Sequence, residues 1–150
     1  MNLLISTYQG LEDISIKEIK EIAKKQAKID LPSILILKDS NKSDLFKIVY
    51  SSRSIIKATI LIDKFNFKSL DNIINRISII NLKKFIKEPF SVSCKRIGNH
   101  DFNSKPVFDS IVKIISNKYS IEANHKEPQT TIVVNIINNK CYISIDYLNI

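Results

Sequence analysis

The sequence predicts a small mixed α+β protein built from two closely abutting parts, and three observations lead to this class. Short apolar runs alternate with segments in which apolar residues recur at helical spacing, which is typical of strands and helices mixed in one fold. The 150 residues are 44% hydrophobic and 25% charged, a balance that can bury a core. The sequence contains no Gly/Ser linkers, repeats or low-complexity tracts. We expect domains at 1–66 and 67–150, joined near residues 63–69, with a break at 87–90 as the alternative.

In the first part, an apolar strand is followed by a helix that Gly10 opens. Glu12 and Asp13 fall in the first turn of this helix, and we place Lys24, Lys25 and Lys28 in its last turn, as the helix dipole favours. Pro32 ends the helical pattern. The elements expected in order are a strand at 3–7, this helix, a buried strand at 33–38, a helix capped by Ser43 and a strand at 55–62.

In the second part, two capped helices alternate with strands, and a hairpin closes the chain. Asn138-Asn139 suits a two-residue hairpin turn because asparagine tolerates positive φ. The expected elements are a helix capped by Ser69, a short basic helical piece at 83–87, a half-exposed strand at 90–96, a helix capped by Ser104 with Pro106 in its first turn, and strands at 131–137 and 140–147.

The charge is basic and uneven along the chain. Lys and Arg number 23 against 15 acids, a formal charge of +8. Residues 1–87 hold 16 basic and 9 acidic groups, and residues 88–150 hold 7 and 6. A polyanion such as nucleic acid is therefore one expected partner, because clustered cations provide steering and counterion release. A solvated lysine-rich surface is the alternative interpretation.

Several kinds of chemistry are not indicated. The two glycines fit no phosphate-cradling loop, so we expect no nucleotide or S-adenosylmethionine site in these residues. Cys94 and Cys141 fit no zinc spacing, and we interpret them as buried thiols without a disulfide. His100 and His125 suggest neither a metal site nor a nucleophile with its base. No apolar run has the length of a membrane span and no leader pattern is present, so we expect a cytoplasmic protein without membrane contact.

The segment between the strand at 90–96 and the following helix is the best candidate for a binding site. It combines two cations, Lys95 and Arg96, with the Gly98 hinge, amide donors at Asn99 and Asn103, His100 and Phe102, and it leads into a helix N-terminus. We interpret it as a loop that contacts phosphates and bases, with a solvated connection as the alternative. Other candidate cations are Arg53 and Lys57 beside the third strand, Lys83 and Lys84 after the third helix, and Lys105 at the fourth helix. Base stacking is best sought at Tyr8, Phe46, Tyr50 or Phe102.

These residues resemble a known family. The run FSVSCKRIGNHDFNS at 90–104, then KEPQ at 126–129 and the hairpin TIVVNIINNKCYISIDY at 131–147, looks like a THUMP domain, an RNA-binding module of several RNA-modifying enzymes. The opening LISTYQGLED at 4–13 is similar to the start of THUMP-containing methyltransferases, in which a ferredoxin-like domain precedes the THUMP domain. The resemblance therefore implies a ferredoxin-like domain packed against an α/β THUMP domain.

The resemblance implies a module that docks the acceptor stem and 3′ end of tRNA and presents a nucleotide to a separate active site. The positions that match the family run are Arg96, Gly98, His100 and Ser104. It further implies the N-terminal part of an S-adenosylmethionine-dependent RNA methyltransferase, with the cofactor bound only by a catalytic domain expected beyond residue 150. A freestanding adaptor that delivers tRNA to a separate enzyme and a non-RNA protein-interaction domain are the alternatives. We assign no catalytic residue.

Overall fold

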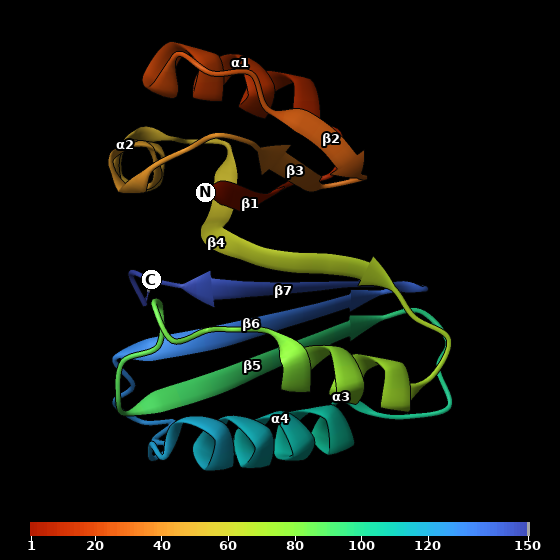
Figure 1. Ribbon diagram of the computed structural model, residues 1–150. Coiled ribbons are helices and arrows are strands. Elements are labelled where there is room, and N and C mark those ends of the chain that lie inside the picture. The colour runs from red at the N-terminus through yellow and green to blue at the C-terminus, as the bar shows by residue number, and fades with distance from the viewer. Residues whose placement is uncertain (150) are drawn as a thin grey trace. The chain divides into compact units, whose positions relative to one another are not determined.

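The chain folds into two compact units, Met1–Leu61 and Ile62–Asn149, in a computed structural model that describes residues 1–149 (Figure 1). The boundary between them falls inside β4 (Ile55–Asn66). No helix within residues 1–149 combines the length and the apolar character that crossing a membrane requires. The units are described one at a time.

The elements of the first unit follow the order β-α-β-β-α-β along the chain. Its strands are antiparallel neighbours in the order β2-β3-β1-β4, and both helices lie on the same side of this sheet (Figure 1). The elements before β4 are β1 (Asn2–Thr7), α1 (Glu12–Ala23), β2 (Lys28–Leu31), β3 (Ile34–Leu37) and α2 (Lys42–Ser51).

The core of this unit follows from the strand register. Leu3 of β1 lies opposite both Leu37 and Ile60, so the three side chains share one face of the sheet. All three are fully buried, as are Ile19 of α1 and Leu45 of α2. Burial of such side chains contributes about 1.5 to 3 kcal/mol each, so this cluster holds the sheet and helices of the unit together.

Two expectations for the first unit were wrong. The α1 helix ends at Ala23 with Lys24 in the left-handed conformation, and Lys28 starts the extra strand β2 instead of ending the helix. Ser43 does not cap α2. The cap is Asn41, whose side chain accepts from Asp44 N at 2.9 Å while the Asp44 carboxylate accepts from Asn41 N at 3.1 Å. These reciprocal hydrogen bonds form a capping box that satisfies the backbone N–H groups of Asn41 and Asp44. Ser43 lies two residues later, inside the helix, and is not part of this box.

Glu18 and Asp44 are among the carboxylates of this unit whose pKa is lowered by their surroundings. Glu18 accepts from Arg53 N at 2.6 Å, Ser54 N at 3.1 Å and Ser54 Oγ at 2.5 Å. Burial raises the pKa of Glu18, but these hydrogen bonds outweigh it and the net pKa lies below the usual 4.5. Burial also raises the pKa of Asp44, yet the Lys25 ammonium at 2.6 Å and Asn41 N bring it below 3.8.

We expect the stability of the chain to fall in acid for this reason. A carboxylate with a depressed folded pKa stabilises the fold above its unfolded pKa, and that contribution is lost as the pH drops through the folded value. Urea unfolding should therefore show little change from pH 7 to about 5 and a decline below about 4.5. Glu18→Gln should cost about 1 kcal/mol at pH 7 and show a shallower acid decline. Equal declines for both proteins would contradict the role of Glu18.

The second unit combines a mixed sheet with two helices. Its strands run in the order β4-β7-β6-β5, with β5 parallel to β6 and β6 antiparallel to β7. Figure 1 shows α3 and α4 side by side against the sheet. The elements after β4 are α3 (Leu70–Ile79), β5 (Phe90–Ile97), α4 (Ser104–Tyr119), β6 (Thr130–Ile137) and β7 (Lys140–Asp146).

The sequence predictions for this unit had mixed outcomes. Ser69 caps α3, accepting from Asn72 N at 3.4 Å, and the two-residue turn at Asn138-Asn139 is confirmed, with φ of 51° at Asn138. The basic piece at 83–87 is a turn without a helix. Ser104 is the first helical residue of α4, and the cap position belongs to Asn103, whose side chain makes no capping hydrogen bond.

Candidate nucleic-acid interface

The predicted loop lies where β5 ends and α4 begins, beside the β6–β7 hairpin turn. Residues 98–103 connect the two elements. Asn138 of the turn donates its N–H to Ile97 O at 2.8 Å, so the hairpin is hydrogen-bonded to the start of the loop. The loop therefore rests on an ordered turn from a segment about 40 residues further along the chain.

Gly98 allows the chain to pass close to this turn. Its φ is +110°, a conformation that side chains with a Cβ rarely adopt. A Cβ built at Gly98 would lie 2.6 Å from Asn138 Oδ1 and 3.2 Å from Asn138 Cα. The glycine therefore allows close packing of the loop against the hairpin turn.

Arg96 and His100 stabilise the loop through hydrogen bonds within the protein. Arg96 Nη1 donates to Gly98 O at 2.9 Å and contacts His100 Nδ1 at 2.8 Å, and His100 Nε2 lies 2.5 Å from Asn138 O. A guanidinium has only donors, so Nδ1 must accept and the proton must sit on Nε2, which then donates to the Asn138 carbonyl. His100 thus bridges the loop and the hairpin.

An aromatic cluster supports the same loop. The His100 ring lies 5.2 Å from Phe102 and 5.7 Å from Phe67, and the two phenylalanines are 6.1 Å apart. Phe67 is buried and donates its N–H to Asn139 O at 2.9 Å. The centroid distances are within the range in which ring pairs add about 0.5 to 1.5 kcal/mol, so the loop is held on a rigid base.

The structure separates the polar residues of the loop into positioning and exposed groups. Arg96 and His100 are half-buried and form hydrogen bonds within the protein, whereas Lys95 and Asn99 are exposed. Lys105 is exposed at the start of α4 and forms only a surface pair with Asp109 at 3.2 Å. Since surface pairs contribute little, Lys105 is an exposed cation after the loop, as Lys95 is before it.

Cys94 of β5 lies beside Ser104 and is only half-buried, so the expectation of a buried thiol was wrong there, whereas Cys141 is buried. Burial raises the pKa of Cys94, and a hydrogen bond with Ser104 lowers it only in part. Burial likewise raises the pKa of Cys141 well above its usual value. Both cysteines are free, and as protonated thiols neither is an activated nucleophile. Among residues 1–149, no group of three or more His, Cys, Asp or Glu side chains could hold a metal ion.

Lys83 and Lys84 of the same unit are not brought to this loop. Lys83 and Lys84 follow the C-terminal end of α3, whereas Phe67, which contacts the loop, precedes the N-terminal end of α3 (Figure 1). The ten residues of this helix span about 15 Å, so the helix separates the two lysines from the loop. Arg53 and Lys57 belong to the first unit, where Arg53 is exposed and Lys57 is half-buried on β4.

Sequence reasoning missed two residues of the loop's support, Phe67 and Asn138. Phe67 follows β4 within Phe65-Asn66-Phe67, and nothing in that stretch points to residue 100. Asn138 was identified only as a turn residue. Both contacts join segments that are more than 30 residues apart, so only the fold reveals them.

The fold and the loop define a mixed α/β domain with a polar loop between β5 and α4. Residues 67–146, more than half of the chain, match the family model described as the THUMP domain. The chain belongs to the THUMP domain family. The resemblance drawn from the run at 90–104 and the hairpin is confirmed.

Comparisons that extend over both units point in the same direction. The tRNA (guanine(6)-N2)-methyltransferase of Archaeoglobus fulgidus is 22% identical over 145 residues, covering 91% of this chain and 36% of the relative. The structure of TrmN from Thermus thermophilus aligns with a TM-score of 0.77 at 16% identity, covering 97% of this chain and 45% of that one. A 4-thiouridine synthetase solved with RNA and ATP aligns with a TM-score of 0.65 at 13% identity, covering 97% and 41%. The mixed α/β fold of both units is therefore shared, and the chain spans little more than a third of the methyltransferase's length.

Proposed function

We propose that this chain is a tRNA-binding module whose loop at residues 95–105 contacts the 3′ end and acceptor stem. The observation that carries the proposal is the loop itself, which lies inside the family match and is locked by Arg96, His100 and the hairpin while Lys95 and Lys105 remain exposed. A rigid loop with exposed cations can bind phosphates without losing further conformational entropy on binding.

The family relationship supports RNA as the polyanion. One relative acts on tRNA by its name, and one structural neighbour was solved with RNA bound. Recognition of a single-stranded end suits a short loop beside a helix N-terminus, because unpaired nucleotides expose their phosphates and base edges together. Asn99, exposed at the tip, supplies an amide that can donate to a base edge or a phosphate.

We further propose that the module serves RNA methylation, as the N-terminal part of an S-adenosylmethionine-dependent enzyme. The support is the alignment of 91% of this chain with the archaeal tRNA methyltransferase. In this arrangement the present residues hold the RNA, and a catalytic domain supplies the methyl donor. A ferredoxin-like first unit would then extend the positively charged track for the RNA.

The test is tRNA binding across a salt series, with intact tRNA and with tRNA lacking its 3′ tail. We expect tail-dependent binding that weakens as salt rises. Lys95→Glu combined with Lys105→Glu should weaken binding about tenfold or more and reduce the slope of log K against log salt by about 1.4, the value for two contacts to a single strand.

A matched control comes from the same helix. Lys113 is exposed on α4, and eight residues from Lys105 correspond to about 12 Å along the axis, beyond the roughly 8 Å screening length at physiological salt. Lys113→Glu should therefore change binding much less than the loop variants. Equal binding of both tRNAs, unaffected by Lys95 and Lys105, would refute the proposal.

A further inference from the structure

The outer face of α2 carries an exposed aromatic pair that the core does not use. Phe46 and Tyr50, four residues apart, are 40% and 72% exposed. Their rings are stacked with centroids 6.4 Å apart and planes only 5° from parallel. The inner face of the same helix buries Leu45 and Ile48 completely, so the fold of this unit is complete without the aromatic pair.

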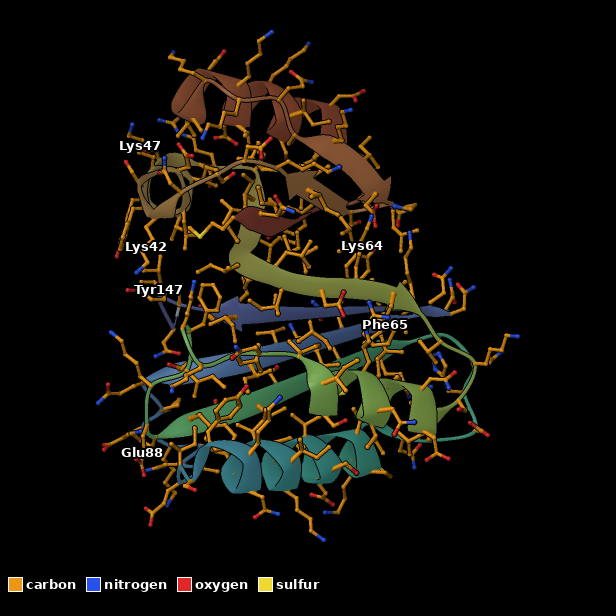
Figure 2. All side chains as sticks on the ribbon, in the orientation of Figure 1. Lys42, Lys47, Lys64, Phe65, Glu88 and Tyr147 are labelled. Atoms are coloured by element: carbon orange, nitrogen blue, oxygen red, sulfur yellow. The ribbon has the colours of Figure 1, made fainter. Side chains whose placement is uncertain are left out.

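The charges around this pair are positive. Lys42 and Lys47 extend from α2 (Figure 2), and both are exposed. The single acid within α2, Asp44, is buried and bound to Lys25 at 2.6 Å, and its charge also interacts with that of Lys47. The helix therefore presents π-faces and ammonium groups together and no exposed carboxylate of its own.

We propose that this face of α2 binds an unpaired nucleotide of the RNA, with a base stacked on the Tyr50 ring and Lys47 against a phosphate. Every base has a π-face that an exposed aromatic ring can accept, and the flanking lysines complement the backbone charge. The inference rests on the proposed RNA-binding function and adds to it a base-stacking site in the first unit. A docked protein segment would not need the cations, whereas a nucleotide uses both features.

A fluorescence experiment tests the stacking directly. The sequence contains no tryptophan, so Tyr50→Trp introduces a single emitter. Titration with intact tRNA and with a single-stranded RNA oligonucleotide should quench this emission in a saturable manner, because a stacked base quenches an indole. Tyr8→Trp is the control, since Tyr8 is also highly exposed, at 60%, but its ring stacks on no other aromatic ring within residues 1–149. Equal quenching at both positions, or at neither, would overturn the proposal.

Affinity measurements give an independent readout that does not depend on the reporter. Tyr50→Ala should weaken binding of the oligonucleotide about 5- to 150-fold, and Tyr50→Phe, which keeps the ring, should bind as the wild type does. Because Tyr50 is exposed, its loss should leave urea unfolding nearly unchanged. Wild-type binding that Tyr50→Ala leaves intact would overturn this inference alone. Absence of RNA binding by the wild type would overturn the proposed function as well.

Discussion

Gly98→Ala is expected to lower the free energy of unfolding by about 2 to 6 kcal/mol and to weaken tRNA binding. The added Cβ costs about 1 to 3 kcal/mol for holding a side chain at φ +110°. It also meets Asn138 Oδ1 at 2.6 Å, and relieving such crowding costs about 1 to 3 kcal/mol more. Urea unfolding and tRNA titration measure the two effects.

The chain offers a matched control for this substitution. Gly10 has a similar φ of +92°, but a Cβ there would meet no atom within 4 Å, so Gly10→Ala reports the backbone strain alone. Asn138→Gly, combined with Gly98→Ala, removes the nearest contact and should recover part of the lost stability. Equal losses at the two glycines, with no recovery in the double variant, would show that the close approach to Asn138 costs nothing.

Arg96→Glu should cause the second large effect, a loss of tRNA affinity of roughly 30-fold or more. The carboxylate would face Gly98 O and His100 Nδ1, two acceptors that Arg96 Nη1 now satisfies. Losing these charge-assisted contacts at a half-buried site should destabilise the loop by about 2 kcal/mol, which corresponds to roughly 30-fold in affinity before any direct contact with RNA is counted.

Arg96→Gln separates the two roles of this residue. Glutamine keeps an N–H donor for the loop but carries no charge, so it should retain more of the loop's order than glutamate does. Backbone hydrogen exchange over residues 98–103 reports that order, and tRNA titration reports binding. If Arg96→Glu exchanged as slowly as the wild type, the positioning role would be wrong, and any lost affinity would come from direct phosphate contact.

The sequence predicted the order of most elements because their signals are local. Apolar spacing gave all four helices, and Asn138-Asn139 gave the hairpin. The errors arose where two local signals compete. Asn41 and Ser43 both suit a cap, and the reciprocal bonds of Asn41 with Asp44 decide between them. The strand β2 has only four residues, and α1 stops at Lys24 without the glycine that usually marks such an end.

The candidate loop could be located from sequence, but the roles of its residues could not. Arg96 is the cation that the family run emphasises, yet its contacts make it a positioning residue for the loop. Lys95 and Lys105 stand out only when exposure is known. Partners such as Phe67 are distant in the sequence, and spacing contains no information about contacts of that range.

The bridge from His100 to Asn138 also sets the order in which the module can mature during synthesis. A nascent chain that ends before residue 138 contains every residue of the loop but lacks both the hairpin carbonyl that His100 binds and the turn amide that Ile97 O accepts from. The parallel partner of β5 is equally late, since β6 begins at Thr130. Ribosome-bound intermediates therefore lack the contacts that hold this loop, and the loop reaches its ordered geometry only once the C-terminal hairpin has left the exit tunnel.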